Sequence, residues 1–458
     1  MIEAMRLSQL VEPLGGQLKG ADTGFIAVSI DTRSLQPGDL YVAIRGTNFD
    51  GNEFVAEAAL RGACAAVVSR GSDVALPQLL VADTRRALGK LGQLNRLASP
   101  ARIIGITGSQ GKTTVKEMTG AILAVAGKTL VTKGNLNNDI GVPLTLLQLE
   151  KSHRYGVIEM GANHAGEIAY SVDLVRPDVA VITNAARAHI EGFGSLDGVA
   201  LGKGEIIDGV RPGGTMVLNR DDRYFESWLR RAAGRHAVSF SIDNAQADYF
   251  ASDLSDGEQK GLRFKLHTPA GEQTVTLNLS GRHNVGNAVA AAALALEAGA
   301  GPDAVRRGLE SVMPVKGRLC PVDNDTGARL IDDSYNASPE SFKAAIDVLA
   351  GLSGQRILLM GDMAELGDIT LSAHRELGEY AHQAGVDELW SLGQSSRESS
   401  RLFGQGGRHF RDRDEVISHC RSNLREGMTI LIKGSRSAGL DQVVRALESD
   451  RNVGTGEK

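Results

Sequence analysis

Between residues 101 and 312, short apolar runs alternate with stretches that have the spacing of helices. This alternation is typical of a parallel sheet whose two faces are covered by helices. Strands in such a sheet are buried and read as nearly continuous apolar runs. Five runs are the predicted strands, and they begin at residues 101, 128, 155, 178 and 214: ARIIGIT, KTLVT, YGVIEM, DVAVIT and GTMVLN.

The pattern changes near residues 99 and 313, and a chain of 458 residues is long enough for about three domains. We therefore predict an α/β protein with a small N-terminal domain over 1–99, a central domain with a mostly parallel sheet over 100–313, and a Rossmann-like domain over 314–458. A hairpin around residue 270 and an alanine-rich helix from His283 are expected within the central domain. In the N-terminal domain the predicted strands are FIAVSIDTRS, DLYVAIRG, AAVVS and QLLVAD.

Composition excludes several functional classes. Apolar residues make up 42% of the chain and charged residues 23%, which is normal for a folded globular protein and excludes fibrous or disordered classes. Because 50 basic residues stand against 55 acidic ones, we expect small-molecule substrates and no nucleic acid partner. No signal peptide and no apolar run of roughly 18 residues is present, so we expect a cytoplasmic protein without membrane insertion. The three cysteines lie far apart and are expected to be reduced structural thiols.

The segment GITGSQGKTT, residues 105–114, lies between a predicted strand and a predicted helix. Glycines let backbone N–H groups close on phosphate oxygens, Lys112 adds positive charge, and the Thr113 hydroxyl is suited to Mg²⁺. The alternative is a glycine turn with a chance lysine. The loop departs from the common G-x-x-x-x-G-K-T pattern, since Ile106 stands where its first glycine would be. By itself this loop leaves a switch GTPase, a small-molecule kinase, a motor or a ligase open.

Two further strands end in polar residues that point to metal chemistry. Glu159 ends an apolar strand, where an acidic Mg²⁺ ligand is common and a structural salt bridge is the alternative. The next strand brings Asn184 and His189 to the same edge of the sheet, because ligands lie beyond the carboxyl ends of parallel strands. A lone histidine would be weak evidence, but its place after this strand favours a role in the site.

Two other positions are ambiguous from composition alone. Lys203 lies on a predicted helix beside glycines and an acid, and its composition favours an ordinary solvated lysine. Asn137 and Asn138 stand at a loop-to-helix junction, where a phosphate contact and helix capping are both reasonable.

The motifs TGSQGKTT, GNLNNDIGVP, IEMGAN, NAARAHI, LGKGEI, RHNVGN and DDSYNASPES together resemble the Mur ligases, which form amide bonds with ATP in peptidoglycan synthesis. The resemblance covers the whole chain. SIDTRSLQPGDLYVAIRGTNFDG, GDMAELG and LIKGSRS are similar to the branch of the family that joins D-alanyl-D-alanine to UDP-N-acetylmuramoyl-tripeptide. The resemblance therefore implies a ligase that uses ATP, passes through an acyl phosphate and makes the pentapeptide precursor of peptidoglycan. We expect it to be a monomer.

The resemblance also assigns roles to residues. It implies two Mg²⁺ ions held by Thr113, Glu159, His189 and Lys203, with Lys203 carbamylated, which reverses the interpretation from composition. The implied catalytic residues are Lys112, Glu159, His189 and Lys203. The implied ATP contacts are Gly108, Ser109, Gly111, Lys112, Thr113, Thr114, Asn138, Asn284, Asn287, Arg318, Asp333 and Tyr335. For Asn284 and Asn287, a capped helix is the alternative.

Substrate contacts are implied in the first and last domains. The uridine diphosphate sugar would bind Ser29, Asp31, Thr32, Arg33, Arg45, Gly46, Asn48 and Asp50, although this segment also reads as an ordinary polar turn. Further substrate contacts in the last domain would be Lys433, Ser435 and Arg436. A hinge near residue 313 is expected to let that domain close over ATP and exclude water.

Three alternatives make distinguishable sequence predictions. A folate ligase has no use for the DTRS segment, and the relative that adds a diamino acid usually carries a DNPR-type motif that is missing here. A regulatory GTPase needs an N/TKxD guanine motif, which the chain also lacks.

Overall fold

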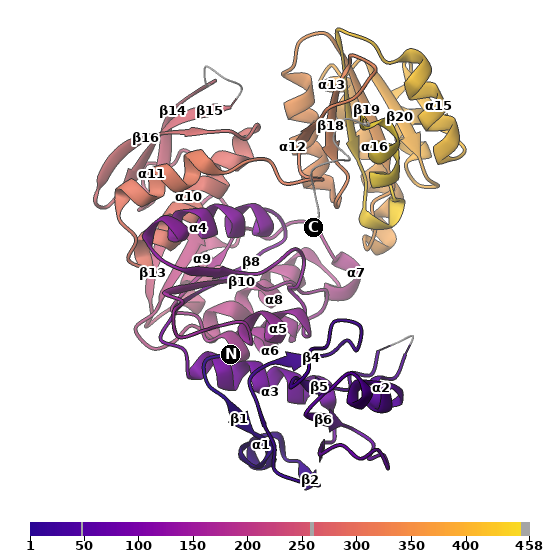
Figure 1. Cartoon of the computed structure of the whole chain (residues 1–458). Helices are drawn as coiled ribbons and strands as arrows, with labels where there is room; N and C mark the ends of the chain where they lie inside the picture. The colour runs from indigo at the N-terminus through magenta and orange to yellow at the C-terminus, as the bar shows by residue number, and fades with distance from the viewer. Residues whose placement is uncertain (47–48, 257–260, 450–458) are drawn as a thin grey trace.

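The computed structural model describes residues 1–46, 49–256 and 261–449. It consists of three parts, each built around its own sheet, and Figure 1 shows them following one another from the indigo N-terminal part to the yellow C-terminal part. Asn48, one of the predicted substrate contacts, lies outside the described residues. The predicted boundaries at residues 99 and 313 stay predictions.

The central sheet is entirely parallel, with the strand order β13-β12-β11-β8-β10-β9. Its five predicted strands are present, and a sixth strand at the edge was not predicted because its first two residues are not buried and its apolar run is short. The strands are β8 (Arg102–Thr107), β9 (Thr129–Val131), β10 (Tyr155–Glu159), β11 (Val179–Ile182), β12 (Thr215–Asn219) and β13 (His236–Phe240).

Helices cover both faces of this sheet because successive strand residues point to opposite sides. Ile104 and Ile106 pack with α4, α10 and α11, whereas Ile103 and Ile158 pack with α5, α6, α8 and α9. The helices are α4 (Lys112–Ala126), α5 (Gly141–Leu146), α6 (Glu167–Val175), α7 (Ile190–Phe193), α8 (Leu196–Asp208), α9 (Phe225–Arg231), α10 (Arg282–Glu297) and α11 (Pro302–Ser311).

A small antiparallel sheet lies beside the central one, with the order β14-β15-β16. The predicted hairpin is confirmed as β15 (Leu262–Thr268) and β16 (Gly271–Leu277), and β14 (Phe250–Asp256) is an additional strand. The predicted alanine-rich helix is α10, most of which is buried.

The last sheet has the order β17-β18-β22-β19-β20-β21, in which only β17 is antiparallel to its neighbour. Two apolar clusters cover its two faces, as in the Rossmann-like arrangement that was predicted. The strands are β17 (Cys320–Val322), β18 (Arg329–Asp333), β19 (Gln355–Gly361), β20 (Glu388–Leu392), β21 (Gly407–Phe410) and β22 (Met428–Lys433). The helices are α12 (Pro339–Ala350), α13 (Thr370–Gln383), α14 (Arg397–Phe403), α15 (Arg413–Asn423) and α16 (Asp441–Leu447), with short 3-10 turns η2 (Gly367–Ile369) and η3 (Arg436–Ala438).

The first sheet has the order β2-β7-β6-β5-β4, and its strands β4 to β7 are parallel. The single long strand predicted from residue 25 is wrong: Phe25 pairs with Met5 in a separate ribbon, whereas Val28 and Ser29 pair with β5. Elements of this part are β1 (Met5–Arg6), α1 (Leu7–Leu14), β2 (Gln17–Lys19), β3 (Gly24–Phe25), β4 (Val28–Ser29), β5 (Leu40–Val42), η1 (Gly51–Phe54), α2 (Val55–Leu60), β6 (Ala65–Val68), β7 (Gln78–Leu80) and α3 (Thr84–Leu97).

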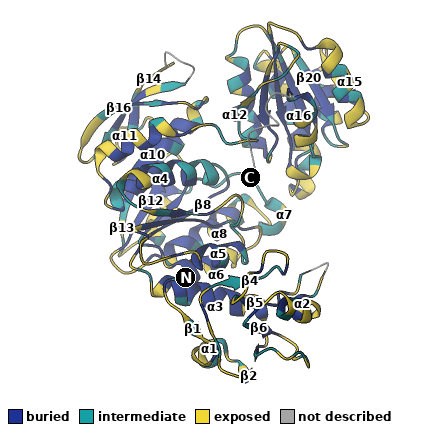
Figure 2. Cartoon of the chain, viewed as in Figure 1, coloured by how far each residue is buried: buried dark blue, intermediate teal, exposed yellow. Residues whose placement is uncertain are grey.

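Burial follows these layers. Figure 2 shows the dark blue of buried residues concentrated in the central and C-terminal sheets, while outer helices and loops carry most of the yellow, exposed residues. Helix α3 joins the first part to the central one, since the Asn95 side chain donates to the carbonyl of Leu146 at 2.8 Å. Within the described ranges, none of the helices combines the length and the apolar character that crossing a membrane requires.

Candidate active site

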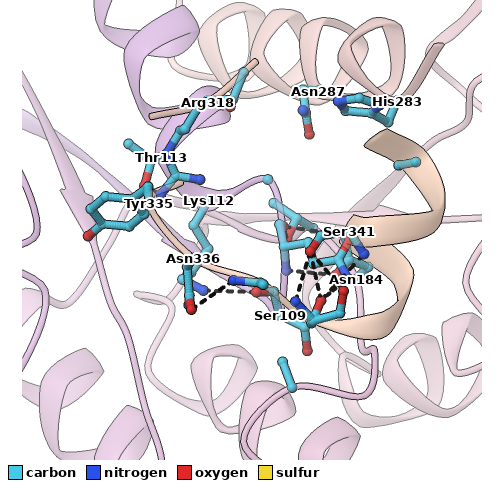
Figure 3. Close-up of a pocket in the computed structure, with 18 of the residues that line it drawn as sticks. Ser109, Lys112, Thr113, Asn184, His283, Asn287, Arg318, Tyr335, Asn336 and Ser341 are labelled. Atoms are coloured by element: carbon cyan, nitrogen blue, oxygen red, sulfur yellow. Dashed lines mark hydrogen bonds between the residues drawn. The ribbon is translucent and has the colours of Figure 1, made fainter. Parts of the chain in front are cut away.

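A cavity of about 900 Å³ lies between the central and last parts. It is lined by the segments that follow β8, β10 and β11, by α10, and by the ends of β18 and β22. Figure 3 shows its side chains reaching inward from these elements. Because carboxyl ends of parallel strands are where α/β proteins bind ligands, this cavity is the candidate active site.

The loop between β8 and α4 has the conformation of a phosphate cradle. Gly108 and Gly111 have φ angles of +142° and +77°, which glycine adopts without strain. Lys112 starts α4, and its Nζ donates to the Gly108 carbonyl at 2.7 Å and to the Ser109 carbonyl at 3.2 Å. Burial lowers the pKa of this ammonium below its usual value. Of the six predicted loop contacts, five line the cavity, and Gly108 lies next to them without lining it: Ser109, Gly111, Lys112, Thr113 and Thr114.

Glu159 lies at the end of β10, opposite the loop, and is 1% exposed. Its Oε1 accepts hydrogen bonds from Asn137 Nδ2 at 2.8 Å and from Thr113 Oγ1 at 3.4 Å. Its Oε2 is buried and accepts no hydrogen bond within the described part of the chain, with Lys116 Nζ 4.0 Å away. A buried carboxylate oxygen without a donor, beside a threonine hydroxyl, fits a hard divalent cation.

His189 and Glu365 form a hydrogen bond between the central and last parts, through His189 Nδ1 and Glu365 Oε2. The backbone of both residues is in the left-handed region, with φ of +56° and +60°. This conformation is strained for a residue other than glycine and is common at functional sites. Burial, and then Lys112, lower the pKa of His189. Both side chains line the cavity, but over residues 1–46, 49–256 and 261–449 no three His, Cys, Asp or Glu side chains are grouped closely enough to form a metal site by themselves.

Lys203 is completely buried, so the expectation of a solvated lysine from composition is wrong. It lies on the face of α8 that packs toward the sheet, and its Nζ donates to the Ala162 carbonyl at 3.0 Å. Burial, with a smaller effect of Lys112, lowers the pKa of this amine to about 7. Lys203 does not line the cavity itself but lies behind Ala162, which does.

The last part contributes an arginine to the phosphate loop. Arg318 Nη2 donates to Thr113 Oγ1 at 2.9 Å, and its guanidinium lies 4.5 Å from the centroid of the Tyr335 ring. The two residues are side by side in Figure 3. Two other predicted contacts pair with each other, because Asp333 and Lys433 form an ion pair at 2.7 Å. Ser435 and Arg436 line the same side of the cavity.

The predicted asparagines divide into two groups. Asn284 and Asn287 face the cavity from α10 and are joined by a hydrogen bond of 3.0 Å. The Asn138 side chain also lines the cavity and accepts from the backbone amide of Gly141, the first residue of α5, at 2.8 Å, while its neighbour Asn137 donates to Glu159. Asn138 therefore bonds the start of α5 and also lines the cavity, and its contact with ATP stays a prediction.

The predicted contacts in the first part lie apart from this cavity, since none of those described lines it. They follow β4 and β5, at the carboxyl edge of the first sheet. Asp31 binds Arg33 at 2.6 Å, which lowers the pKa of that carboxyl to about 2, and Asp50 accepts from the Asn52 amide. The other described members of the set are Ser29, Thr32, Arg45 and Gly46, of which Thr32 alone is buried.

Comparisons with known proteins agree with this arrangement. Family models match residues 25–96 (Mur ligase family, catalytic domain), 106–295 (Mur ligase middle domain) and 317–436 (Mur ligase, glutamate ligase domain). The UDP-N-acetylmuramoyl-tripeptide--D-alanyl-D-alanine ligase of Escherichia coli (strain K12) is 47% identical over 449 residues, which is 98% of this chain and 99% of that protein. The chain belongs to the Mur ligase family.

Solved structures support the same conclusion. A crystal structure of MurF from Acinetobacter baumannii is 36% identical, with a TM-score of 0.91 over 97% of this chain and 99% of that one. MurF ligase from Thermotoga maritima, solved in complex with ADP, is 26% identical with a TM-score of 0.82 over 92% of this chain and 96% of that one. The predicted fold class is therefore confirmed.

Four residues of this Mur ligase are placed at the site by the structure alone, without having been predicted. Lys116 lies against Glu159, and Glu365 contacts His189. Arg187 and Gln110 contact the last part directly. Each of these residues lies within a few positions of a predicted contact or inside one of the motifs quoted above. The sequence carries no other signal for them.

Proposed function

We propose that this Mur ligase joins D-alanyl-D-alanine to UDP-N-acetylmuramoyl-tripeptide with ATP and so makes the pentapeptide precursor of peptidoglycan. The observation that carries the proposal is the match to ligases of that name over 98% of the chain, together with a cavity built on a phosphate loop. We also place the protein in the cytoplasm, as a monomer whose three domains divide near residues 99 and 313.

The chemistry has to activate a carboxylate, which is a poor electrophile in water. The tripeptide carboxylate attacks the γ-phosphorus of ATP, ADP leaves, and an acyl phosphate forms. The amine of the dipeptide then attacks the acyl carbon, loses a proton, and inorganic phosphate leaves as the amide forms. Lys112 and Arg318 would bind the phosphate oxygens during the first step, which is supported by their positions next to Thr113.

Two Mg²⁺ ions would neutralise charge on the transferring phosphoryl group. Thr113 and Glu159 would hold the first ion, and the supporting observation is that the buried Glu159 Oε2 accepts no hydrogen bond from any described residue. His189 and Lys203 would hold the second. A lysine ammonium cannot bind a cation, but an amine with a pKa of about 7 is substantially neutral near pH 7 and can add CO₂ to become a carbamate.

The three parts then have separate tasks. The residues after β4 and β5, including Arg33 and Arg45, would hold the uridine diphosphate sugar. Lys433, Ser435 and Arg436 would contact substrate from the last part, on the wall of the cavity opposite the phosphate loop. The nucleotide would be contacted by Asn138, Asn284, Asn287, Asp333 and Tyr335.

The test is release of phosphate from ATP by the purified protein. We expect release that requires both UDP-N-acetylmuramoyl-tripeptide and D-alanyl-D-alanine, with the pentapeptide detected by mass spectrometry. Release that is indifferent to either substrate contradicts the proposal. Lys203→Ala should be inactive and regain part of its activity with a short-chain carboxylate; an active Lys203→Ala would remove the carbamate from the mechanism.

A further inference from the structure

One loop of the central part is held by carboxylates of the last part. Arg187 lies in the loop between β11 and α7, and its Nε donates to Glu340 Oε1 at 2.6 Å. Its Nη1 and Nη2 donate to the two oxygens of Glu376 at 3.0 and 3.2 Å. Glu340 lies in the first turn of α12 and Glu376 lies in α13, so a single guanidinium joins two helices of the last part to the central sheet.

This contact differs from an ordinary surface ion pair. The Arg187 side chain is 30% exposed, and three of its nitrogens donate in the planar fork geometry that suits carboxylates. The hydrogen bonds from Arg187 hold the pKa of Glu376 down to about 2, and Lys343 binds the same carboxylate at 2.5 Å. The Glu376 carboxylate is therefore charged at neutral pH.

A second contact reaches the same end of α12. Gln110, in the phosphate loop, donates from Nε2 to Ser338 Oγ at 2.8 Å, and Ser338 is the N-cap of α12. The backbone N–H of Gln110 also donates to Asn184 Oδ1 at 3.0 Å, and Asn184 lies on the loop that carries Arg187. The phosphate loop, the loop after β11 and the start of α12 are thus connected to one another.

The position of Arg187 relates this contact to the chemistry. Arg187 precedes His189 by two residues, and the segment just before α12 carries Tyr335, against which Arg318 lies as it reaches Thr113. Any displacement of the last part that breaks the Arg187 contact would also move Arg318 away from the phosphate loop.

We propose that Arg187 is a positioning residue for the ATP site: by binding Glu340 and Glu376 it holds the last part over the phosphate loop, so that Arg318 and His189 are in place together. The link to catalysis rests on the proposed function, whereas the link to nucleotide affinity and to the shape of the molecule does not.

The experiment is a double-mutant cycle of Arg187→Met, Glu376→Gln and the double variant. We expect each single variant to bind ADP about tenfold more weakly in calorimetry, because a smaller fraction of the protein has the last part in the binding position. The double variant should bind no more weakly than either single one. X-ray scattering of the ligand-free variants should show a larger radius of gyration than the unmodified protein.

Arg356→Met is the matched control, since Arg356 binds Asp387 with similar geometry at 24% exposure but within the last part alone. It should leave ADP affinity and the radius of gyration unchanged. Three outcomes would each overturn the inference. The first is a double variant whose loss of ADP affinity is the product of the two single losses. The others are an unchanged ADP affinity in Arg187→Met and an equal loss of affinity in Arg356→Met. Failure of the unmodified protein to release phosphate with both substrates would instead overturn the proposed function.

Discussion

At the scale of single residues, the site depends on places where the backbone leaves no room for a side chain. A Cβ on Gly111 would collide with the amide oxygen of Asn287, and the position is left-handed as well. Any other residue at position 111 therefore requires the Asn287 side chain to move. At Lys203 the surroundings act on the side chain itself, since burial lowers the pKa of its amine to about 7.

Gly111→Ala should weaken ADP binding about tenfold, because Asn287 must rotate away and lose its bond to Asn284. Gly213→Ala is the matched control: its φ is +78°, nearly that of Gly111, but nothing lies within 4 Å of the added Cβ. Both variants should lose about 1 kcal/mol of stability for the left-handed conformation. Calorimetry and thermal unfolding separate the two effects, and equal ADP affinities would contradict the prediction.

At the scale of elements, register decides which charged residues meet. Strands β18 and β22 are parallel and pair Asp333 with Lys433 at their carboxyl ends, where both side chains are almost enclosed. Each had been predicted as a separate ligand contact. Their pairing shows that the same two residues also hold together the strand ends that line the cavity.

Lys433→Met should destabilise the protein by about 3–5 kcal/mol, because it leaves the Asp333 carboxylate buried without its cation. Adding Asp333→Asn to this variant should recover part of the loss. The control is Lys128→Met, which removes an ion pair of the same 2.7 Å length whose side chains are about half exposed, and should cost less than about 1 kcal/mol. Urea unfolding with hydrogen exchange of β18 and β22 measures both, and equal costs for the two lysines would refute the argument.

At the scale of the whole molecule, the cavity exists because two separately built sheets face each other. Its walls come from segments more than 200 residues apart, such as Thr113 and Arg318. The contacts that hold the two sheets in this position are mainly charged, so they should respond to pH more than the apolar cores do.

The ion pair of Glu376 should weaken in acid. Its pKa of about 2 lies below the usual 4.5, so the stabilisation is complete above pH 4.5 and disappears as pH falls toward 2. Relative to Glu376→Gln, the unmodified protein should therefore keep a constant advantage in melting temperature above about pH 5 that shrinks below pH 4.5. An advantage that grows in acid would contradict this sign.

The predictions succeeded where one local pattern was sufficient. The strands of the central sheet follow from apolar runs, and the phosphate loop follows from glycines placed between a strand and a helix. They failed where the outcome depended on a distant partner. The run from Phe25 was divided between two sheets because Met5 and β5 both pair with it.

By itself, the sequence determined the α/β class, the nucleotide loop and the family, since these depend on periodicity, glycine positions and short motifs that are local in the chain. Only the tertiary structure decided that Lys203 is buried with a pKa of about 7, that Asp333 meets Lys433, and that Arg187 joins the central sheet to α12 and α13. The physical reason is that burial and charge pairing are set by residues far away in the chain. No local pattern contains that information.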